Sequence, residues 1–339
     1  MNITYLIGAG ASRDALPIVN EIPNRIEKVI SLLESQDLQL SVTEKFDITN
    51  LELTKREVQI NLINDLKWLL ENSSNHASID TFAKKLYIKN RDKDLNRLKS
   101  AFSIYLIIEQ TINKADKRYD GFFASILKDN YYDFPENLKI LNWNYDFQFE
   151  KTYSEYSDQK ELRSNKNSLN IVSKYTRDRR DNNNFSIIKL NGTTNIIGDN
   201  GINEYHYFSD FENSLSITFL EKILRNYAAL QLVTVNRLYS GLSFAWERFY
   251  NDNNDIIKIA QSKTFETEVL VVIGYSFPYF NREVDRAIIG NMKNLSKVYF
   301  QSPDAETIKE RFLSIRDDIP EKSLLTRKDV GQFLLPNEL

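Results

Sequence analysis

Five short apolar runs, each stopping at glycine, asparagine or another polar residue, constrain most strongly what this chain can fold into. They occupy residues 3–7, 138–141, 187–190, 269–273 and 298–300. A short apolar run bounded by turn residues is typical of a strand buried on both faces. The segments between the runs carry apolar residues at helical spacing. Strands that alternate with helices predict an α/β fold, a doubly wound parallel sheet of the Rossmann-like type with large helical insertions.

Helical periodicity is clearest in the first half of the chain, where Ser78 also has the sequence context of a helix N-cap. The polar stretch over about 154–184 is typical of an exposed loop or an irregular insertion. We therefore expect a domain over residues 1–310, with a helical insertion over about 20–135 and a second helical segment over about 210–260, followed by a C-terminal extension over 311–339.

The composition of the chain excludes several classes of function. The chain has 339 residues, 42% of them hydrophobic, a net charge of −3 and no cysteine. The apolar share excludes global disorder, and the charge argues against a strongly basic nucleic-acid-binding domain, so no direct nucleic-acid contact is expected. Without cysteine there is no disulfide, thiol catalysis or cysteine zinc site, and the two histidines, His76 and His206, argue against a multi-histidine metal site. No apolar run approaches the roughly 20 residues of a membrane span, and the first residues lack the basic start of a signal peptide, so we expect a cytoplasmic protein with no membrane contact.

The glycine turn after the first run is the first candidate site. In parallel sheets, ligands bind beyond the carboxyl ends of the strands. Gly8 and Gly10 let backbone amides approach a pyrophosphate there, and Ser12 adds a hydroxyl donor. The alternative is structural, because tight strand-to-helix turns need glycine anyway. The turn also departs from the dehydrogenase fingerprint, since Arg13 stands where a third glycine would be.

The other strand ends are polar as well. Asn144 and Asp146 lie two apart, so that both side chains can face the same way and hold a ribose, a carboxamide or a water. The alternative is an Asx turn that closes the strand, which is common and which the spacing alone favours. Asn191 and Ser276 follow two further runs. The role of His206 stays open, because a lone histidine is more often structural than catalytic.

Taken in order, these strand ends resemble the motifs of the sirtuin family. GAGAS at 8–12 is similar to the family's GAGxS, NWNYD at 142–146 to its TQNID or TxNYD, KLNGT at 189–193 to its KLHG, and GYSFP at 274–278 to its GTS or GYSFP loop. SIDTFAKK at 78–85, SFAWE at 243–247 and the extended stretch 274–286 resemble most closely the prokaryotic sirtuin-like proteins of antiphage defence, which are NAD-cleaving effectors.

The resemblance implies a sirtuin-type fold and an NAD+ hydrolase that acts in abortive infection, activated through a partner sensor protein and by homo- or hetero-oligomerisation. It implies catalytic roles for Asn144, Asp146 and Asn191. The cofactor-binding residues that it implies are Gly8, Ala9, Gly10, Ala11, Ser12, Gly192, Gly274 and Ser276.

The sequence departs from the family's motifs in two ways that bear on the implied activity. Without cysteine the family's zinc module is absent, so neither metal nor protein deacetylation is expected. The catalytic histidine of KLHG is Asn191 here, and an amide cannot accept a proton near neutral pH. The alternative is therefore a catalytically inactive subunit of a defence complex that binds NAD or ADP-ribose.

Overall fold

The computed structural model describes residues 1–174, 184–197, 204–205, 212, 214–232, 238–244, 246–247 and 255–339. The chain divides into two compact units. The sheet unit comprises Met1–Asp14, Ala115–Gly192 and Ser243–Leu339, and the helical unit comprises Ala15–Lys114 and Thr193–Leu242.

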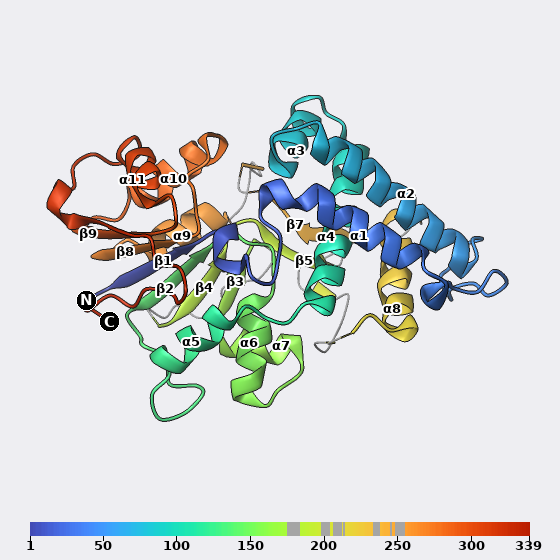
Figure 1. Ribbon diagram of the computed structural model, residues 1–339, viewed down its shortest axis with the longest axis horizontal. Helices are drawn as coiled ribbons and strands as arrows, with labels where there is room; N and C mark the ends of the chain where they lie inside the picture. Colours follow the sequence, from blue (N-terminus) through green and yellow to red (C-terminus); the bar gives the residue numbers. More distant parts are fainter. Residues whose placement is uncertain are drawn as a thin grey trace. The chain divides into compact units, whose positions relative to one another are not determined.

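A seven-stranded sheet forms the centre of the sheet unit (Figure 1). Its order is β10-β9-β8-β1-β2-β4-β3, and its pairings are parallel. The strands are β1 (Ile3–Ile7), β2 (Leu138–Asn142), β3 (Ile171–Ser173), β4 (Ser186–Lys189), β8 (Val269–Ile273), β9 (Lys297–Gln301) and β10 (Leu324–Arg327). All five apolar runs are strands of this sheet, which confirms the predicted doubly wound α/β fold.

The strand order reverses next to β1. After β1 the chain forms β2, β3 and β4 on one side, and it then returns to the other side for β8, β9 and β10. In register, Tyr5 of β1 lies between Ile140 of β2 and Val271 of β8. Ligand crevices form beyond the carboxyl ends of the strands at such a reversal. The loops that follow β1 and β8 therefore flank the expected ligand position.

Each face of the sheet carries its own apolar core. On one face, Leu6, Leu141 and Val272 pack with side chains of α9 (Ile256–Lys263), α10 (Arg282–Ile289) and α11 (Ala305–Leu313). On the other face, the aromatic side chains of α5 (Lys117–Ile126) and α6 (Gln148–Ser157) cover Tyr5 and its neighbours. Figure 1 shows the two groups of helices on opposite sides of the sheet. Because apolar side chains cover both faces of the sheet, a polar ligand is expected at the carboxyl edge of the strands.

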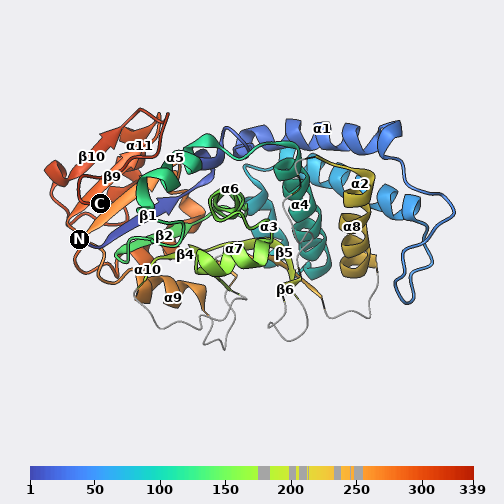
Figure 2. The same ribbon diagram turned by 90° about the horizontal axis from the view of Figure 1, so that it is seen from below.

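Five helices make up most of the helical unit. They are α1 (Ile22–Glu34), α2 (Lys55–Ser74), α3 (Ile79–Ile88), α4 (Asp92–Ile112) and α8 (Ile217–Tyr227), the last continued by a π-helical turn, Ala228–Leu232. Helix α1 packs against α2 and α4, and α8 packs against the same two helices (Figure 2). Ser78 caps α3 as predicted, since its side chain accepts a hydrogen bond from the Thr81 amide.

A small sheet completes the helical unit, and it corrects one sequence prediction. It contains β6 (Glu204–Tyr205), β5 (Gly192–Ile197) and β7 (Tyr239–Leu242), in that order. The segment expected to be helical over about 210–260 contains α8 and its π-helical turn, but it also contains β7, which lies beside β5 in this sheet. Residues 233–237 lie outside the described residues. The exposed loop or irregular insertion expected over about 154–184 is wrong for its first part, which contains α7 (Leu162–Ser168) and the edge strand β3 of the sheet unit. Residues 175–183 lie outside the described residues.

The observed unit boundaries differ from the expected ones. The first segment of the helical unit runs from Ala15 to Lys114, so α5 belongs to the sheet unit. Residues 311–339 contribute strand β10, and beyond it Phe333 joins the core beneath α5. The Tyr5 hydroxyl donates a hydrogen bond of 2.8 Å to the carbonyl oxygen of Leu334. The C-terminal segment is thus part of the sheet unit.

Candidate functional site

The glycine turn after β1 rests directly on the end of β8. The Gly8 amide donates to the carbonyl oxygen of Ile273 and the Gly10 amide to that of Gly274, both at 3.0 Å, while the Ala11 amide donates to Gly8 at 2.9 Å. Three amides of the turn are therefore engaged with main-chain carbonyls. This differs from the expectation that they face a pyrophosphate. The outward part of the turn is Ala9, which is exposed, together with the half-buried Gly10.

Close backbone packing explains why glycine occupies these positions. A Cβ atom on Gly274, which has a φ of +62°, would lie 2.3 Å from the Ala11 nitrogen. A Cβ atom on Gly8 would lie 2.7 Å from the Gly274 carbonyl oxygen, and one on Gly10 would lie 2.8 Å from the Gly274 Cα. Either contact is closer than real Cβ atoms tolerate. The glycines of the two motifs are thus required by the contact of the two loops with each other, whatever ligand they hold.

Three predicted site residues meet in one hydrogen-bonded group, the Ser12–Asn144–Asp146 cluster. The Ser12 hydroxyl donates to Asp146 Oδ2 at 2.9 Å, and Asn144 Nδ2 donates to Ser12 Oγ at 3.2 Å and to the Gly8 carbonyl oxygen at 3.1 Å. All three side chains are buried. The structure therefore brings together residues of the first two strand-end motifs.

The orientation of the Asn144 amide follows from these contacts. A carbonyl oxygen such as that of Gly8 can only accept, so the nitrogen of the amide must face it. Both N–H groups of Asn144 are directed inward, to Gly8 and Ser12. Within the part of the chain that the structure describes, no hydrogen bond reaches Asn144 Oδ1. That oxygen can accept a hydrogen bond from a water or a ribose hydroxyl.

Tyr119 of α5 completes the cluster, and sequence reasoning missed it. Its hydroxyl lies 2.8 Å from Ser12 Oγ. Because the single Ser12 proton goes to Asp146, the Tyr119 hydroxyl must donate to Ser12. Ser12 thus uses its one proton and both lone pairs. A phosphate contact by Ser12 would require the exchange of one of these bonds. No motif marks Tyr119, since it lies in an ordinary amphipathic helix.

A buried ion pair supports the cluster from beneath. Lys189 of β4 donates to the main-chain oxygen of Asp146, and its Nζ lies 3.4 Å from Glu150 Oε2 of α6. Both members of the pair are fully buried. Burial raises the pKa of Asp146, whereas the Lys189 ammonium and the Ser12 hydrogen bond oppose that rise. Burial likewise raises the pKa of Glu150, with Lys189 opposing it. The ammonium thus keeps two desolvated carboxylates nearer their charged forms.

Asn191 lies at the end of β4, beside the loop that carries Asn144. Its Nδ2 donates to the Trp143 carbonyl oxygen at 3.2 Å and to the Tyr145 hydroxyl at 3.3 Å. Gly192 follows with a φ of +72°, in the left-handed region that favours glycine. The Asn191 side chain therefore holds the 143–145 loop.

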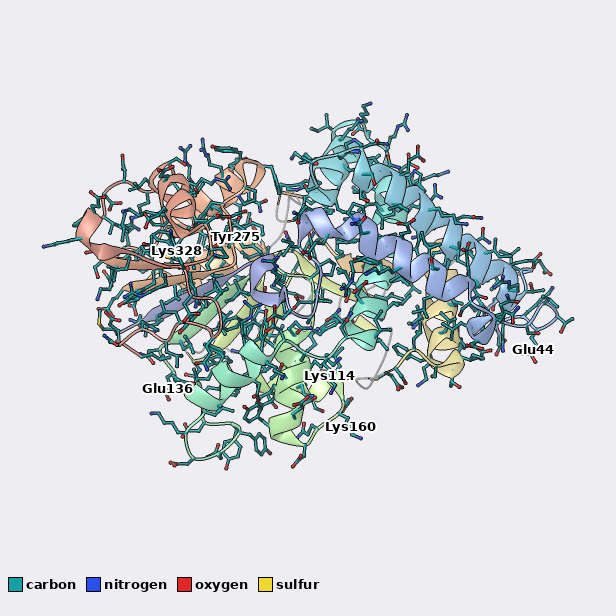
Figure 3. The ribbon with its side chains drawn as sticks, in the orientation of Figure 1. Glu44, Lys114, Glu136, Lys160, Tyr275 and Lys328 are labelled. Carbon is teal, nitrogen blue, oxygen red and sulfur yellow. The ribbon has the colours of Figure 1, made fainter. Side chains whose placement is uncertain are left out.

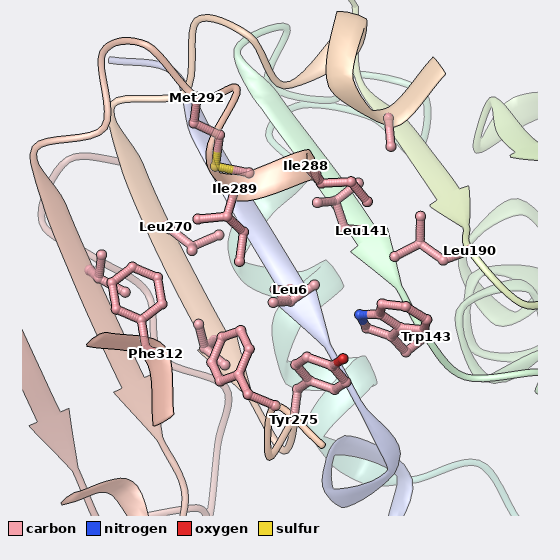
Figure 4. Packing of buried hydrophobic residues seen from close by; sticks show 14 of the residues in the cluster. Leu6, Leu141, Trp143, Leu190, Leu270, Tyr275, Ile288, Ile289, Met292 and Phe312 are labelled. Carbon is pink, nitrogen blue, oxygen red and sulfur yellow. The ribbon is translucent and has the colours of Figure 1, made fainter. Parts of the chain in front are cut away.

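An aromatic pair covers the core beside the glycine turn. The rings of Trp143 and Tyr275 are stacked, with centroids 5.4 Å apart and planes 6° apart, and both lie beside Leu6 (Figure 4). Among the described residues, two buried donors here have no acceptor, Trp143 Nε1 and Asn142 Nδ2. Buried donors normally find a partner. Both atoms are enclosed by the protein, so they are exceptions within the core and offer no surface to a ligand.

Ser276 lies apart from the cluster. Its side chain is exposed, and its carbonyl oxygen accepts a hydrogen bond of 2.8 Å from Arg311. Gly274, from the same motif, does contact the glycine turn. His206 lies outside the described residues.

The described residues lack two further features. They contain no group of three or more His, Cys, Asp or Glu side chains placed to hold a metal ion. Among their helices, none combines the length and the apolar character needed to span a membrane.

Comparisons with known proteins add a distant similarity. No protein-family model and no curated protein matches the chain. Among solved structures, a mutant Sir2 homologue in complex with 2′-O-acetyl-ADP-ribose aligns over 94% of each chain, with a TM-score of 0.36 and 11% identity. The fold assignment here rests on the strand order and the parallel pairings of the sheet itself.

Proposed function

We propose that the carboxyl edge of the sheet unit binds NAD and hydrolyses its nicotinamide–ribose bond, with ADP-ribose and nicotinamide as products. One observation carries the proposal. The Asn144 amide is locked with its nitrogen inward, which leaves Oδ1 to accept a hydrogen bond at the edge where the strand order reverses. The four motifs that resemble those of sirtuins supply the choice of NAD as substrate.

In this mechanism Asn144 orients the attacking water. The water oxygen forms a bond to the ribose C1′, and the bond from C1′ to nicotinamide breaks with its electron pair passing to the ring nitrogen. Because the nicotinamide leaves neutral, it needs no proton from the protein. The proton of the water passes to bulk solvent, since Asn191 cannot accept it and Asp146 lies behind Ser12. Positioning and electrostatics then carry the rate.

Asp146 and Lys189 act as positioning residues in this scheme. Asp146 accepts from Ser12, which in turn accepts from Asn144, so the carboxylate fixes the orientation of the whole cluster. Lys189 fixes the main chain at Asp146 from the opposite side. Neither residue contacts the substrate in this scheme. The loss of either one is expected to disorder the Asn144 amide.

The wider role that we propose follows the resemblance stated above. NAD hydrolysis depletes the cofactor in the cytoplasm and stops growth, which is the outcome of abortive infection in antiphage defence. We propose that a partner protein senses the trigger and that oligomerisation of the chain accompanies its activation.

A second candidate is a subunit that binds NAD or ADP-ribose without cleaving it. Asn191 favours this candidate, because an amide occupies the position of the family's base.

Release of nicotinamide separates the two candidates. The full chain is incubated with NAD, with and without the protein encoded beside it, and free nicotinamide is measured by chromatography. Release that is lost in Asn144→Ala supports the hydrolase. Calorimetric binding of NAD or ADP-ribose without release supports the non-catalytic subunit. If neither ligand binds, both candidates fail.

A further inference from the structure

Arg118, in the first turn of α5, is a buried cation that faces the glycine turn. Its side chain is 7% exposed, and its Nη2 donates hydrogen bonds to two consecutive carbonyl oxygens of the turn, that of Gly10 at 3.2 Å and that of Ala11 at 3.1 Å. On the other side of the same peptide groups, Ile273 and Gly274 accept hydrogen bonds from amides of the turn. The guanidinium of Arg118 is thus a second anchor of the turn, beside the end of β8.

An aspartate at the N-cap of α5, Asp116, pairs with this guanidinium. Its two carboxylate oxygens accept from Arg118 Nε at 3.0 Å and from Arg118 Nη2 at 2.6 Å, which is the two-pronged pairing that a planar guanidinium allows. Asp116 also accepts a hydrogen bond of 3.1 Å from the Asp14 amide, just beyond the turn. A lysine ammonium is a point charge, and it cannot serve both carboxylate oxygens and both carbonyl oxygens in this arrangement. The contacts therefore call for arginine at position 118.

The C-terminal segment keeps the Arg118 side chain in place. Arg118 Nη1 donates to the Val330 carbonyl oxygen at 3.4 Å, and the guanidinium carbon lies 5.7 Å from the centroid of the Phe333 ring. Gln301, at the end of β9, donates to two carbonyl oxygens of the same segment, at 2.7 and 2.6 Å. Figure 3 labels Lys328, which lies just before this stretch. Contacts on several sides therefore fix the orientation of the guanidinium.

The fixed carbonyl groups also determine how the exposed part of the turn is oriented. The Gly8 carbonyl oxygen accepts from Asn144 Nδ2 and from the Ala11 amide, so it points into the protein. Because a peptide unit is planar and trans, the Ala9 N–H points the opposite way. Ala9 is exposed, so a ligand can reach this amide. If the neighbouring Gly10 carbonyl rotated outward, its partial negative charge would face the same ligand.

We infer that Arg118 is a positioning residue, which keeps the Gly10 and Ala11 carbonyl oxygens turned away from the diphosphate of NAD and the Ala9 amide turned toward it. The inference rests on the proposed function, because it takes NAD as the ligand. A turn that is fixed before the ligand arrives loses less conformational entropy on binding, so the contribution of Arg118 appears as affinity. Arg118 does not contact the reacting ribose in this scheme, so kcat is expected to depend on it only weakly.

The substitution Arg118→Lys in the full chain tests this role. It keeps a positive charge opposite Asp116 but removes the planar fork that holds the two carbonyl oxygens. The dissociation constants of NAD and ADP-ribose, measured by calorimetry, are expected to rise about tenfold or more, with a smaller change in the kcat of nicotinamide release. Phe123→Leu is the control, because Phe123 lies on the same helix and packs against Phe149 in the core. It is expected to lower stability without weakening either ligand. Unchanged affinity in Arg118→Lys, or an equal loss of affinity in both variants, would overturn the inference.

Amide hydrogen exchange of the ligand-free chain gives a second readout, which does not depend on NAD. Peptides that cover residues 8–12 are expected to exchange faster in Arg118→Lys than in the wild type, whereas Phe123→Leu leaves their exchange unchanged. If the wild type binds neither NAD nor ADP-ribose, the proposed function fails, and faster exchange in Arg118→Lys alone still supports the anchoring of the turn by Arg118. Unchanged exchange at residues 8–12 would overturn the inference whatever the ligand affinities.

Discussion

Ser12 and Asp146 share a hydrogen bond of 2.9 Å, although 134 positions separate them in the chain. Tyr119 donates to Ser12 in turn, so that the hydrogen bonds run in one direction toward the carboxylate. This chain of bonds joins the glycine turn, the loop after β2 and helix α5. Substitutions within it are therefore expected to be non-additive, because each residue orients the next.

Asn144→Ala is expected to abolish nicotinamide release, with a loss of about 10²-fold or more, because the group that orients the attacking water is removed. The loss should appear in kcat. Asn96→Ala, an exposed asparagine on α4, serves as the control and is expected to keep full activity. Equal activity of the two variants would exclude a role for Asn144 in cleavage.

Asn191→Ala is expected to lower the rate of nicotinamide release by less than the 10²–10⁴-fold that is typical when a general base is lost, because Asn191 transfers no proton. Asn191→His is expected to raise the rate of nicotinamide release, with a pH profile that acquires the titration of an imidazole. A pH profile identical to the wild type would show that the histidine does not reach the reacting ribose.

Gly274→Ala is expected to destabilise the chain by about 1 kcal/mol or more, because the new Cβ would sit 2.3 Å from the Ala11 nitrogen in a left-handed conformation. Gly121→Ala in α5 is the matched control. Its Cβ would meet nothing within 4 Å, so it is expected to stabilise the helix by about 0.5–1 kcal/mol. Urea unfolding measures both. Similar effects of the two substitutions would contradict the role of Gly274 in loop packing.

Lys189→Met is expected to cost about 3–5 kcal/mol of unfolding free energy, because it removes the ammonium that offsets the desolvation of the buried Glu150 carboxylate. Adding Glu150→Gln removes that isolated charge, so the double variant is expected to be more stable than the single one. The comparison again uses urea unfolding. If the double variant is as unstable as Lys189→Met, the lost stability comes from packing and not from the buried charge.

Asp285→Asn is expected to change how stability depends on pH. The Tyr275 hydroxyl lies 3.0 Å from Asp285 Oδ2, and burial raises the pKa of this carboxyl well above its usual value. The folded state thus holds a proton that the unfolded chain releases above about pH 4, so the contribution of Asp285 to stability falls as the pH rises toward its folded pKa. Asparagine cannot ionise. The variant should therefore gain stability over the wild type on going from about pH 5 to pH 8, and a difference that is constant with pH would contradict this.

The central part of the fold was predictable because its strands are buried on both faces. Such strands have continuous apolar sequences, as in β1 and β8, and burial of this kind leaves few alternatives. The edge strands β3 and β10 have no comparable signal, since they are short and pair on one side only. Strand β7 was missed because local helical spacing did not reveal its pairing with the distant β5.

The sequence predicted only those residues of the candidate site that directly follow a strand. Parallel strands bring their carboxyl ends to one edge, which is why Ser12, Asn144 and Asp146 meet. Ser276 does not join them, because its loop turns its side chain to the surface. The Tyr119 hydroxyl and the Lys189–Glu150 pair depend on how helices pack against the sheet, and no local pattern encodes that.

The position of β1 in the sheet has a consequence for synthesis of the chain. Ile3 pairs with Leu138 on one side and with Val269 on the other. The central strand is therefore translated before both of its neighbours, and it acquires the second one only after the residues up to β8 have been made. Closing such long loops slows folding, and an unpaired apolar strand invites association with other nascent chains. During that interval β1 is the natural target of chaperones that bind exposed apolar segments.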